Sequence, residues 1–294
     1  MKRVLMTGAT GFLGSKLLAR LTSDPEQYEV TVLKRSTSDT WRIANLLPDL
    51  ASFDLDRTPI RDVFGAIPFD TILHCATDYG RKPVPRSEMI EANLMLPLRL
   101  LETGIDHGVH TFISTDTMLD KNVSDYTLSK RQFREWLQSL STRIAGINMV
   151  LEHFYGPGDD ATKFVSSILR SLLNKETSIS LTPGLQRRDF IYVDDVVDAF
   201  LCVMQALGSE TGGYFDFEVG SGRSVSIQEF VTMARGICGN EITRLEFGAL
   251  PYRPNEPMEV AVNVSKLHAF GWCAKYDLHE GLRQTVQFER TRLA

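Results

Sequence analysis

The segment that most constrains what this chain can fold into is its first 14 residues, MKRVLMTGATGFLG. An apolar strand is predicted at residues 3–6, and Gly8, Gly11 and Gly14 follow at intervals of three before the helical pattern SKLLARL. A strand that turns directly into a helix needs one glycine where φ is positive, one where the backbone approaches a pyrophosphate, and one for close helix packing. The helix N-terminus then presents backbone amides to the anion. This context favours a dinucleotide-binding loop over an ordinary glycine turn.

Length and composition limit the fold classes, binding partners and cellular locations to be considered. With 294 residues and 43% hydrophobic content, the chain can bury a large α/β core, as one unit or as two lobes. The net charge of -5 gives no reason to expect nucleic acid, and no segment suggests a secretory signal or a membrane span, so we expect a cytoplasmic protein. The four cysteines, Cys75, Cys202, Cys238 and Cys273, lack metal-binding spacing; we expect reduced packing residues and no metal site.

The end of the second predicted strand, residues 29–33, bears on the choice of coenzyme. Lys34 and Arg35 follow it, where an acid would bind the adenosine ribose of NAD. Two cations suit the 2′-phosphate of NADP, because charge-assisted hydrogen bonds to phosphate are strong. A solvated basic turn is the other interpretation. Asp54, at the end of the next predicted strand, residues 53–55, is a candidate contact for the adenine amino group.

Strands and helices then alternate. Residues 71–76 and 111–114 are predicted strands, separated by an amphipathic helix at residues 89–102 that contains Asn93. This rhythm predicts an α/β fold with a doubly wound parallel sheet. We interpret His74 as a core residue. The polar loop at residues 77–81 follows the fourth strand, on the side where such sheets bind ligands.

Candidate catalytic residues follow the fifth strand. Tyr126 and Lys130 are four residues apart and therefore share one helix face. A tyrosine with a pKa of about 10 transfers protons poorly at neutral pH unless a nearby cation favours the phenolate, and Lys130 is placed to lower that pKa. Thr115, at the strand end, can hold a substrate oxygen. The other interpretation is a surface tyrosine beside a solvated lysine.

The chain resembles the extended short-chain dehydrogenase/reductase family that acts on nucleotide sugars. The resemblance rests on TGATGFLG at residues 7–14, YTLSK at 126–130, FYGPGD at 154–159, RDFIYVDD at 188–195, VGSG at 219–222 and the tail from Arg253 to Trp272. Within the family, TDYGRK (77–82), STDT (114–117) and LEHFYGPGD (151–159) are most similar to reductases of CDP-linked 4-keto-3,6-dideoxyhexoses.

The resemblance implies a Rossmann domain at residues 1–150 and a smaller C-terminal α/β lobe at 151–294 for the sugar nucleotide, with about 188–210 returning to the Rossmann domain. It implies that His153 contacts the nicotinamide and that Phe164, Arg187 and Arg253 line the sugar-nucleotide cleft. For Arg187, a surface ion pair is equally acceptable. The remaining expected contacts are, for the coenzyme, Gly8, Thr10, Gly11, Phe12, Leu13, Lys34, Arg35, Asp54, Leu55, Ala76, Asn93, Tyr126 and Lys130, and, for the substrate, Thr77, Tyr79, Asp116 and Thr117.

Residues after the second and fifth predicted strands favour some reactions of the family over others. A dehydratase of this family carries Asp and Glu after the strand-end threonine, whereas here Thr117 replaces the glutamate, and a hydroxyl cannot serve as that base. Lys34 and Arg35 favour NADPH that is consumed in each turnover, as a net reduction requires. We therefore expect an NADPH-dependent C4 ketoreductase. An NAD-dependent 4-epimerase and a catalytically inactive dinucleotide sensor are the other hypotheses. Asp116 stays open between a sugar contact and a structural carboxylate. A homodimer is expected through the helices at residues 89–102 and 126–140.

Overall fold

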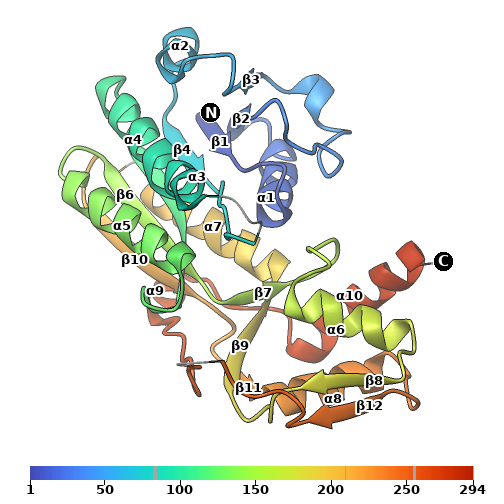
Figure 1. Ribbon diagram of the computed structural model, residues 1–294. Helices are drawn as coiled ribbons and strands as arrows, with labels where there is room; N and C mark the ends of the chain where they lie inside the picture. The colour runs from blue at the N-terminus through green and yellow to red at the C-terminus, as the bar shows by residue number, and fades with distance from the viewer. Residues whose placement is uncertain (82–84, 209, 254–255, 294) are drawn as a thin grey trace. The chain divides into compact units, whose positions relative to one another are not determined.

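The computed structural model describes residues 1–81, 85–208, 210–253 and 256–293 (Figure 1). The chain divides into two units. The first unit comprises Met1–Leu151 and Phe200–Phe217, and the second comprises Glu152–Ala199 and Glu218–Ala294. The returning segment is thus Phe200–Phe217, later than the expected 188–210, because residues 187–192 form a strand of the second unit's own sheet. Lys82, the last residue of the TDYGRK motif, lies outside the described residues.

A seven-stranded sheet forms the first unit, in the order β10-β6-β5-β4-β1-β2-β3. The neighbouring pairs from β6 to β3 are all parallel. This order confirms the doubly wound α/β sheet. The strands are β1 (Lys2–Thr7), β2 (Tyr28–Lys34), β3 (Ser52–Asp54), β4 (Thr71–His74), β5 (Thr111–Thr117), β6 (Ala145–Leu151) and β10 (Tyr214–Val219).

Helices α2, α4 and α5 of this unit pack into one apolar core against the sheet. The predicted helix at residues 89–102 is three consecutive segments, with a π-helical turn, η2, in the middle. Pro97 accounts for the interruption, because proline lacks an N–H and its ring clashes with the carbonyl four residues earlier. The segments are α1 (Phe12–Thr22), α2 (Ile60–Ala66), α3 (Arg86–Ile90), η2 (Glu91–Met95), α4 (Leu96–Asp106) and α5 (Asp125–Leu140), with a 3₁₀ turn, η1, at Leu47–Asp49.

The second unit contains a three-stranded sheet, β11-β9-β7, and a parallel pair, β12-β8. Its core is aromatic: Phe190 on β9 stacks on Phe230 of α8 with ring centroids 4.1 Å apart. Its elements are β7 (His153–Tyr155), α6 (Phe164–Leu173), β8 (Ser178–Leu181), β9 (Arg187–Tyr192), β11 (Ser224–Ser226), α8 (Ile227–Ile237), β12 (Arg244–Phe247), α9 (Ser265–Ala269) and α10 (Leu278–Leu293). Helix α7 (Val193–Leu207) begins in this unit and ends in the first.

The composition led us to expect reduced cysteines, no metal site and no membrane span, and the structure can be compared with each expectation. Cys75, Cys202, Cys238 and Cys273 are all free thiols. Cys273 is exposed, so the expectation that it is a packing residue is wrong. Over the described residues, no group of side chains is arranged to hold a metal ion. None of the helices described has the length and apolar composition needed to cross a membrane.

Candidate active site

The glycine loop joins β1 to α1. Gly8 adopts a positive φ of 70°, and a Cβ there would overlap the backbone of Cys75 and Ala76. A Cβ on Gly14 would overlap the carbonyl oxygen of Gly8, so α1 packs directly against the loop. Gly11 precedes the helix and caps it without a side chain, which leaves the first amides of α1 available to an anion. Thr10 is half-buried and Gly11 exposed, while Phe12 and Leu13 are buried beneath the loop.

Cations and carboxylates meet where β2 and β3 end. Lys34 is half-buried and pairs in register with Asp54, and Arg35 is exposed. The Asp54 carboxylate accepts hydrogen bonds from the Ser36 hydroxyl at 2.6 Å and the Asp56 amide at 3.0 Å. The Ser36 hydrogen bond is the main reason that the pKa of Asp54 lies below its ordinary value. Asp54 is therefore engaged by its own neighbourhood, and its expected adenine contact stays a prediction, as does that of Leu55.

His74 ends β4 inside the core. Its Nδ1 lies 2.8 Å from the Thr7 hydroxyl, and its ring packs near Phe112 and Phe133. Burial, and next the charge of Lys130, lowers the pKa of His74 to about 3, so the ring is neutral at physiological pH. Its Nε2 has no hydrogen-bond partner among the described residues. This environment suits a core histidine with one engaged nitrogen.

Thr115, Tyr126 and Lys130 come from adjacent elements of the first unit. Strand β5 continues through Thr117, beyond the predicted end at Ser114, and places Thr115 near its end in the sheet. Helix α5 starts at Asp125, where Ser124 and Thr127 form a reciprocal capping box, so Tyr126 lies in the first turn and Lys130 one turn later. Lys130 is 2% exposed, and its Nζ has no hydrogen-bond partner among the described residues.

The surroundings of Tyr126 raise its pKa instead of lowering it. Burial has the largest effect, followed by Tyr79, whose ring centroid lies 5.1 Å away, and by Asp116. A hydrogen bond with the Thr117 hydroxyl and the charge of Arg81 act in the opposite direction. Within the polypeptide, the expected depression of the pKa by Lys130 is therefore not observed. Burial lowers the pKa of Lys130 itself, and Asp116 raises it.

Asn93 is a structural clamp in this structure. Its side-chain oxygen accepts from the Asp78 amide at 2.8 Å, and its Nδ2 donates to the Asp78 carbonyl at 2.8 Å and to Ser129 Oγ at 3.0 Å. The side chain is fully buried. It thus ties the loop at residues 77–81 to the helix of the catalytic candidates. These bonds leave it little capacity for the expected coenzyme contact. The loop itself presents Ala76, Thr77 and Tyr79, of which Tyr79 is exposed.

Asp116 and Thr117 are turned toward protein. Asp116 accepts from Arg134 Nε at 2.5 Å, Asn148 Nδ2 at 3.1 Å and the Thr117 amide at 2.7 Å. The structure thus gives both residues partners other than the substrate expected for them. Sequence reasoning missed Arg134, although it lies four residues beyond Lys130 on a helix that was predicted. It also missed Asn148, which no pattern in the sequence marks.

The candidates on the second unit have mixed environments. His153 Nδ1 lies 2.8 Å from Glu152 Oε1, and the imidazole meets Phe190 edge-on at 5.6 Å. Phe164 packs against the aromatic core, which is a structural role. Arg187 donates to Ser224 and lies 3.5 Å from Glu229, so its guanidinium is engaged internally. Arg253 is exposed.

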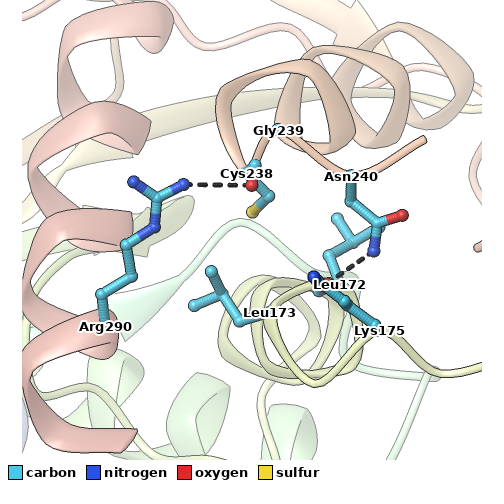
Figure 2. Close-up of a pocket in the computed structure, with 7 residues that line it drawn as sticks. All are labelled: Leu172, Leu173, Lys175, Cys238, Gly239, Asn240 and Arg290. Carbon is cyan, nitrogen blue, oxygen red and sulfur yellow. Dashed lines mark hydrogen bonds between the residues drawn. The ribbon is translucent and has the colours of Figure 1, made fainter. Parts of the chain in front are cut away.

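A separate pocket of about 400 Å³ lies in the second unit, and none of the predicted site residues lines it (Figure 2). Its polar groups serve the ends of helices: Arg290 donates to the carbonyl of Cys238 at 3.0 Å, and Asn240 to that of Leu172 at 2.6 Å. Carbonyls at helix C-termini need such donors. We therefore interpret this pocket as structural. The lining residues are Leu172, Leu173, Lys175, Cys238, Gly239, Asn240 and Arg290.

The chain is similar to known proteins in sequence and in fold. Residues 4–220 match the model of the NAD dependent epimerase/dehydratase family. The chain is 33% identical to CDP-abequose synthase of Salmonella muenchen, with 98% of each chain covered, and 31% identical to that of Salmonella typhimurium strain LT2, with 97% of each covered. It is also similar to the structure of UDP-glucose 4-epimerase from Thermotoga maritima with UDP-glucose, with a TM-score of 0.85, 23% identity, and 99% and 100% of the chains covered.

Proposed function

The chain belongs to the NAD-dependent epimerase/dehydratase family, and we propose that within it the protein uses NADPH to reduce the C4 ketone of a CDP-linked 4-keto-3,6-dideoxyhexose. The family makes it an NAD(P)-dependent enzyme of the short-chain dehydrogenase/reductase type that modifies a nucleotide sugar. The observation that carries the proposal is the buried Lys130, whose Nζ lacks a partner among the described residues, one helical turn from Tyr126. Such a reduction belongs to deoxysugar and polysaccharide biosynthesis.

The residues present fit a nicotinamide dinucleotide. A side chain at Gly8 or Gly14 would overlap the backbone, and the first amides of α1 can bind the pyrophosphate. The buried ammonium of Lys130 has donors to give to ribose hydroxyls. Lys34 and Arg35 are the cations for a 2′-phosphate. When bound, NADPH supplies the hydride for the reduction.

The protein supplies the proton. We assign Tyr126 as the donor to the oxygen on C4 and Thr115 as the hydroxyl that binds the same oxygen. The raised pKa of Tyr126 keeps the phenol protonated before the reaction, as a proton donor must be. Lys130 brings a positive charge that offsets the phenolate left behind. Neither assignment depends on the second unit.

The partners of Asp116 favour reduction over dehydration. A dehydratase needs an acid and a base at this strand end in addition to hydride transfer. Here Arg134 and Asn148 bind the Asp116 carboxylate, and Thr117 contributes only a hydroxyl. The 4-epimerase stays a second candidate, because the structural relative from Thermotoga maritima is an epimerase. A dinucleotide sensor without catalysis would have no need for Thr115, Tyr126 and Lys130 together.

The second unit is proposed to bind the sugar nucleotide. Glu152 holds Nδ1 of His153, which leaves Nε2 for a ligand. Arg253 is exposed and suits a diphosphate, because its planar guanidinium donates two parallel hydrogen bonds. For Arg187 the observed bonds to Ser224 favour the internal role over the ligand contact.

The test is oxidation of NADPH, followed by its absorbance, against CDP-, dTDP-, GDP- and UDP-linked 4-keto sugars. We expect turnover with the CDP-linked ketone, and we expect Tyr126→Phe to lose ~10²–10⁴ in kcat while NADPH affinity is kept. Tyr28→Phe, which alters a buried tyrosine of β2, is the matched control. Coenzyme that copurifies, with C4 epimers interconverted without added NADPH, would establish the epimerase. Full NADPH affinity with no turnover of any ketone would establish the sensor.

A further inference from the structure

A buried group of charges lies beside the proposed catalytic residues. Asp116, at the end of β5, pairs with Arg134 of α5, and the two side chains are 4% and 19% exposed. Asn148 of β6 donates to Asp116 at 3.1 Å and to Asp216 of β10 at 2.8 Å. Tyr214 donates to the same Asp216 oxygen at 3.1 Å. All five of these residues belong to the first unit.

The position of Arg134 on α5 connects these buried charges to the proposed catalytic residues. Tyr126, Lys130 and Arg134 are spaced by four residues, so they follow one face of α5. Thr115 and Asp116 are consecutive on β5. The Arg134–Asp116 pair therefore ties the strand that carries the proposed oxygen-binding hydroxyl to the helix that carries the proposed acid and cation.

We propose that Arg134 is a positioning residue for Tyr126 and Lys130: it holds the Asp116 carboxylate against α5, where the carboxylate is the fixed counter-charge of Lys130 and is withdrawn from the substrate. This inference rests on the proposed function and resolves the role of Asp116. Both carboxylate oxygens are engaged within the protein, Oδ1 by the Thr117 amide and Oδ2 by Arg134 and Asn148. Three donors thus occupy most of the roughly four acceptor sites of the carboxylate, which leaves it little capacity for a sugar hydroxyl.

The electrostatics agree with this geometry. Burial lowers the pKa of Lys130, whereas Asp116 raises it and Arg134 lowers it. The other charged and titratable groups around Lys130 and Asp116 are Tyr126 and Arg134 on α5, Tyr214 and Asp216 on β10, and His74 and Cys75 at the end of β4. Asp116 and Asp216 together balance Lys130 and Arg134. Without the carboxylate of Asp116, the buried ammonium of Lys130 would lose its proton at a lower pH.

The first experiment uses Asp116→Asn and measures kcat, the KM of the sugar and the affinity for NADPH as functions of pH. We expect the alkaline decline of both kcat and NADPH affinity to move to lower pH, because Lys130 and Tyr126 both lose a group that raises their pKa. The KM of the sugar should change little. The proposal is overturned if the alkaline decline of kcat and of NADPH affinity stays at the pH of the wild type. It is also overturned if the KM of the sugar rises while kcat is unchanged, which would make Asp116 a substrate contact.

The second experiment tests Arg134 directly. Arg134→Met should lower kcat by about 10- to 100-fold, because misplaced catalytic groups lose rate steeply, and Arg134→Lys should recover part of the loss. Arg131→Met is the control, because Arg131 lies on the same helix and pairs with Glu135 at the surface. A kcat of Arg134→Met equal to that of the control overturns the proposal. If Arg134→Met does not fold, Asp116→Asn decides alone.

Different measurements test the proposed ketoreductase activity and the proposed role of the Arg134–Asp116 pair. The pH dependence of NADPH binding, measured by the fluorescence of its dihydronicotinamide, needs no sugar. A wild type that reduces no ketone in the panel, together with a shifted binding profile in Asp116→Asn, would reject the ketoreductase and retain the role of the pair. An active wild type with an unshifted profile would reject the pair and retain the reductase.

Discussion

At the scale of single residues, the sequence names candidate catalytic residues but not the side chains that pair beside them. Thr115, Tyr126 and Lys130 could be named because their spacing follows a strand end and a helix face. Arg134 and Asn148 could not, because an ion pair between a strand end and a helix depends on how the two pack, and spacing along the chain does not encode that. The sign of the pKa shift on Tyr126 was wrong for the same reason: burial, which the sequence does not reveal, exceeds the effect of any neighbouring cation.

We expect few side chains to set the choice between NADPH and NADH. Arg35 is exposed beside Lys34, and Asp54 and Asp56 lie on the adjacent segment. Arg35→Ala should raise the KM of NADPH by about 10- to 100-fold and leave that of NADH nearly unchanged, because a hydrogen bond to a charged group contributes about 1.5–3 kcal/mol. Steady-state kinetics with both coenzymes measures this. Arg57→Ala, which removes a cation that faces Asp54 instead, is the control. Equal changes with both coenzymes would mean that Arg35 does not bind the 2′-phosphate.

At the scale of elements, the predicted strands and helices lie within a few residues of the observed ones, and the departures have physical causes. Strand β5 exceeds its prediction because Thr115, Asp116 and Thr117 are polar, and a polar run is not typical of a buried strand unless partners such as Arg134 and Asn148 are known. Helix α6 begins only at Phe164, since Asp160 accepts from the Thr162 amide and hydroxyl, a local pattern that competes with the helix. The π-helical turn before Pro97 could have been anticipated from the proline.

That π-helical turn carries the clamp formed by Asn93, which gives a prediction for the element. Asn93→Ala leaves the amide and carbonyl of Asp78 without their partners, which should lower the free energy of unfolding by about 2 kcal/mol. It should also raise the KM of the sugar, because the loop with Tyr79 loses its attachment to α5. Chemical denaturation and steady-state kinetics measure the two effects, and Asn122→Ala, in an exposed loop, is the control. Loss of NADPH affinity with the stability intact would instead restore the expected coenzyme contact.

At the scale of the whole molecule, we propose a homodimer. Large apolar side chains are exposed on neighbouring segments of the first unit: Ile90 on α3, Met95 on η2, and Leu128 and Trp136 on α5. Monomers seldom leave so many large apolar groups on adjacent helices in contact with water, and helices of this kind pair well across a two-fold axis. Since α5 also carries Tyr126 and Lys130, such an interface would support the helix on which the chemistry depends.

The dimer is tested by Trp136→Asp and its matched control, Trp41→Asp; both tryptophans are 49% exposed, but Trp41 lies outside these helices. Because a buried interface tryptophan contributes about 2 kcal/mol or more, Trp136→Asp should weaken the dimer by about 30-fold or more, whereas Trp41→Asp should not change it. Sedimentation velocity over a range of protein concentrations measures the association. A wild type that is monomeric throughout, or a Trp136→Asp variant that associates as the wild type does, rejects this interface. If the dimer is lost while kcat is kept, α5 holds its catalytic side chains through its own capping box and the Arg134–Asp116 pair.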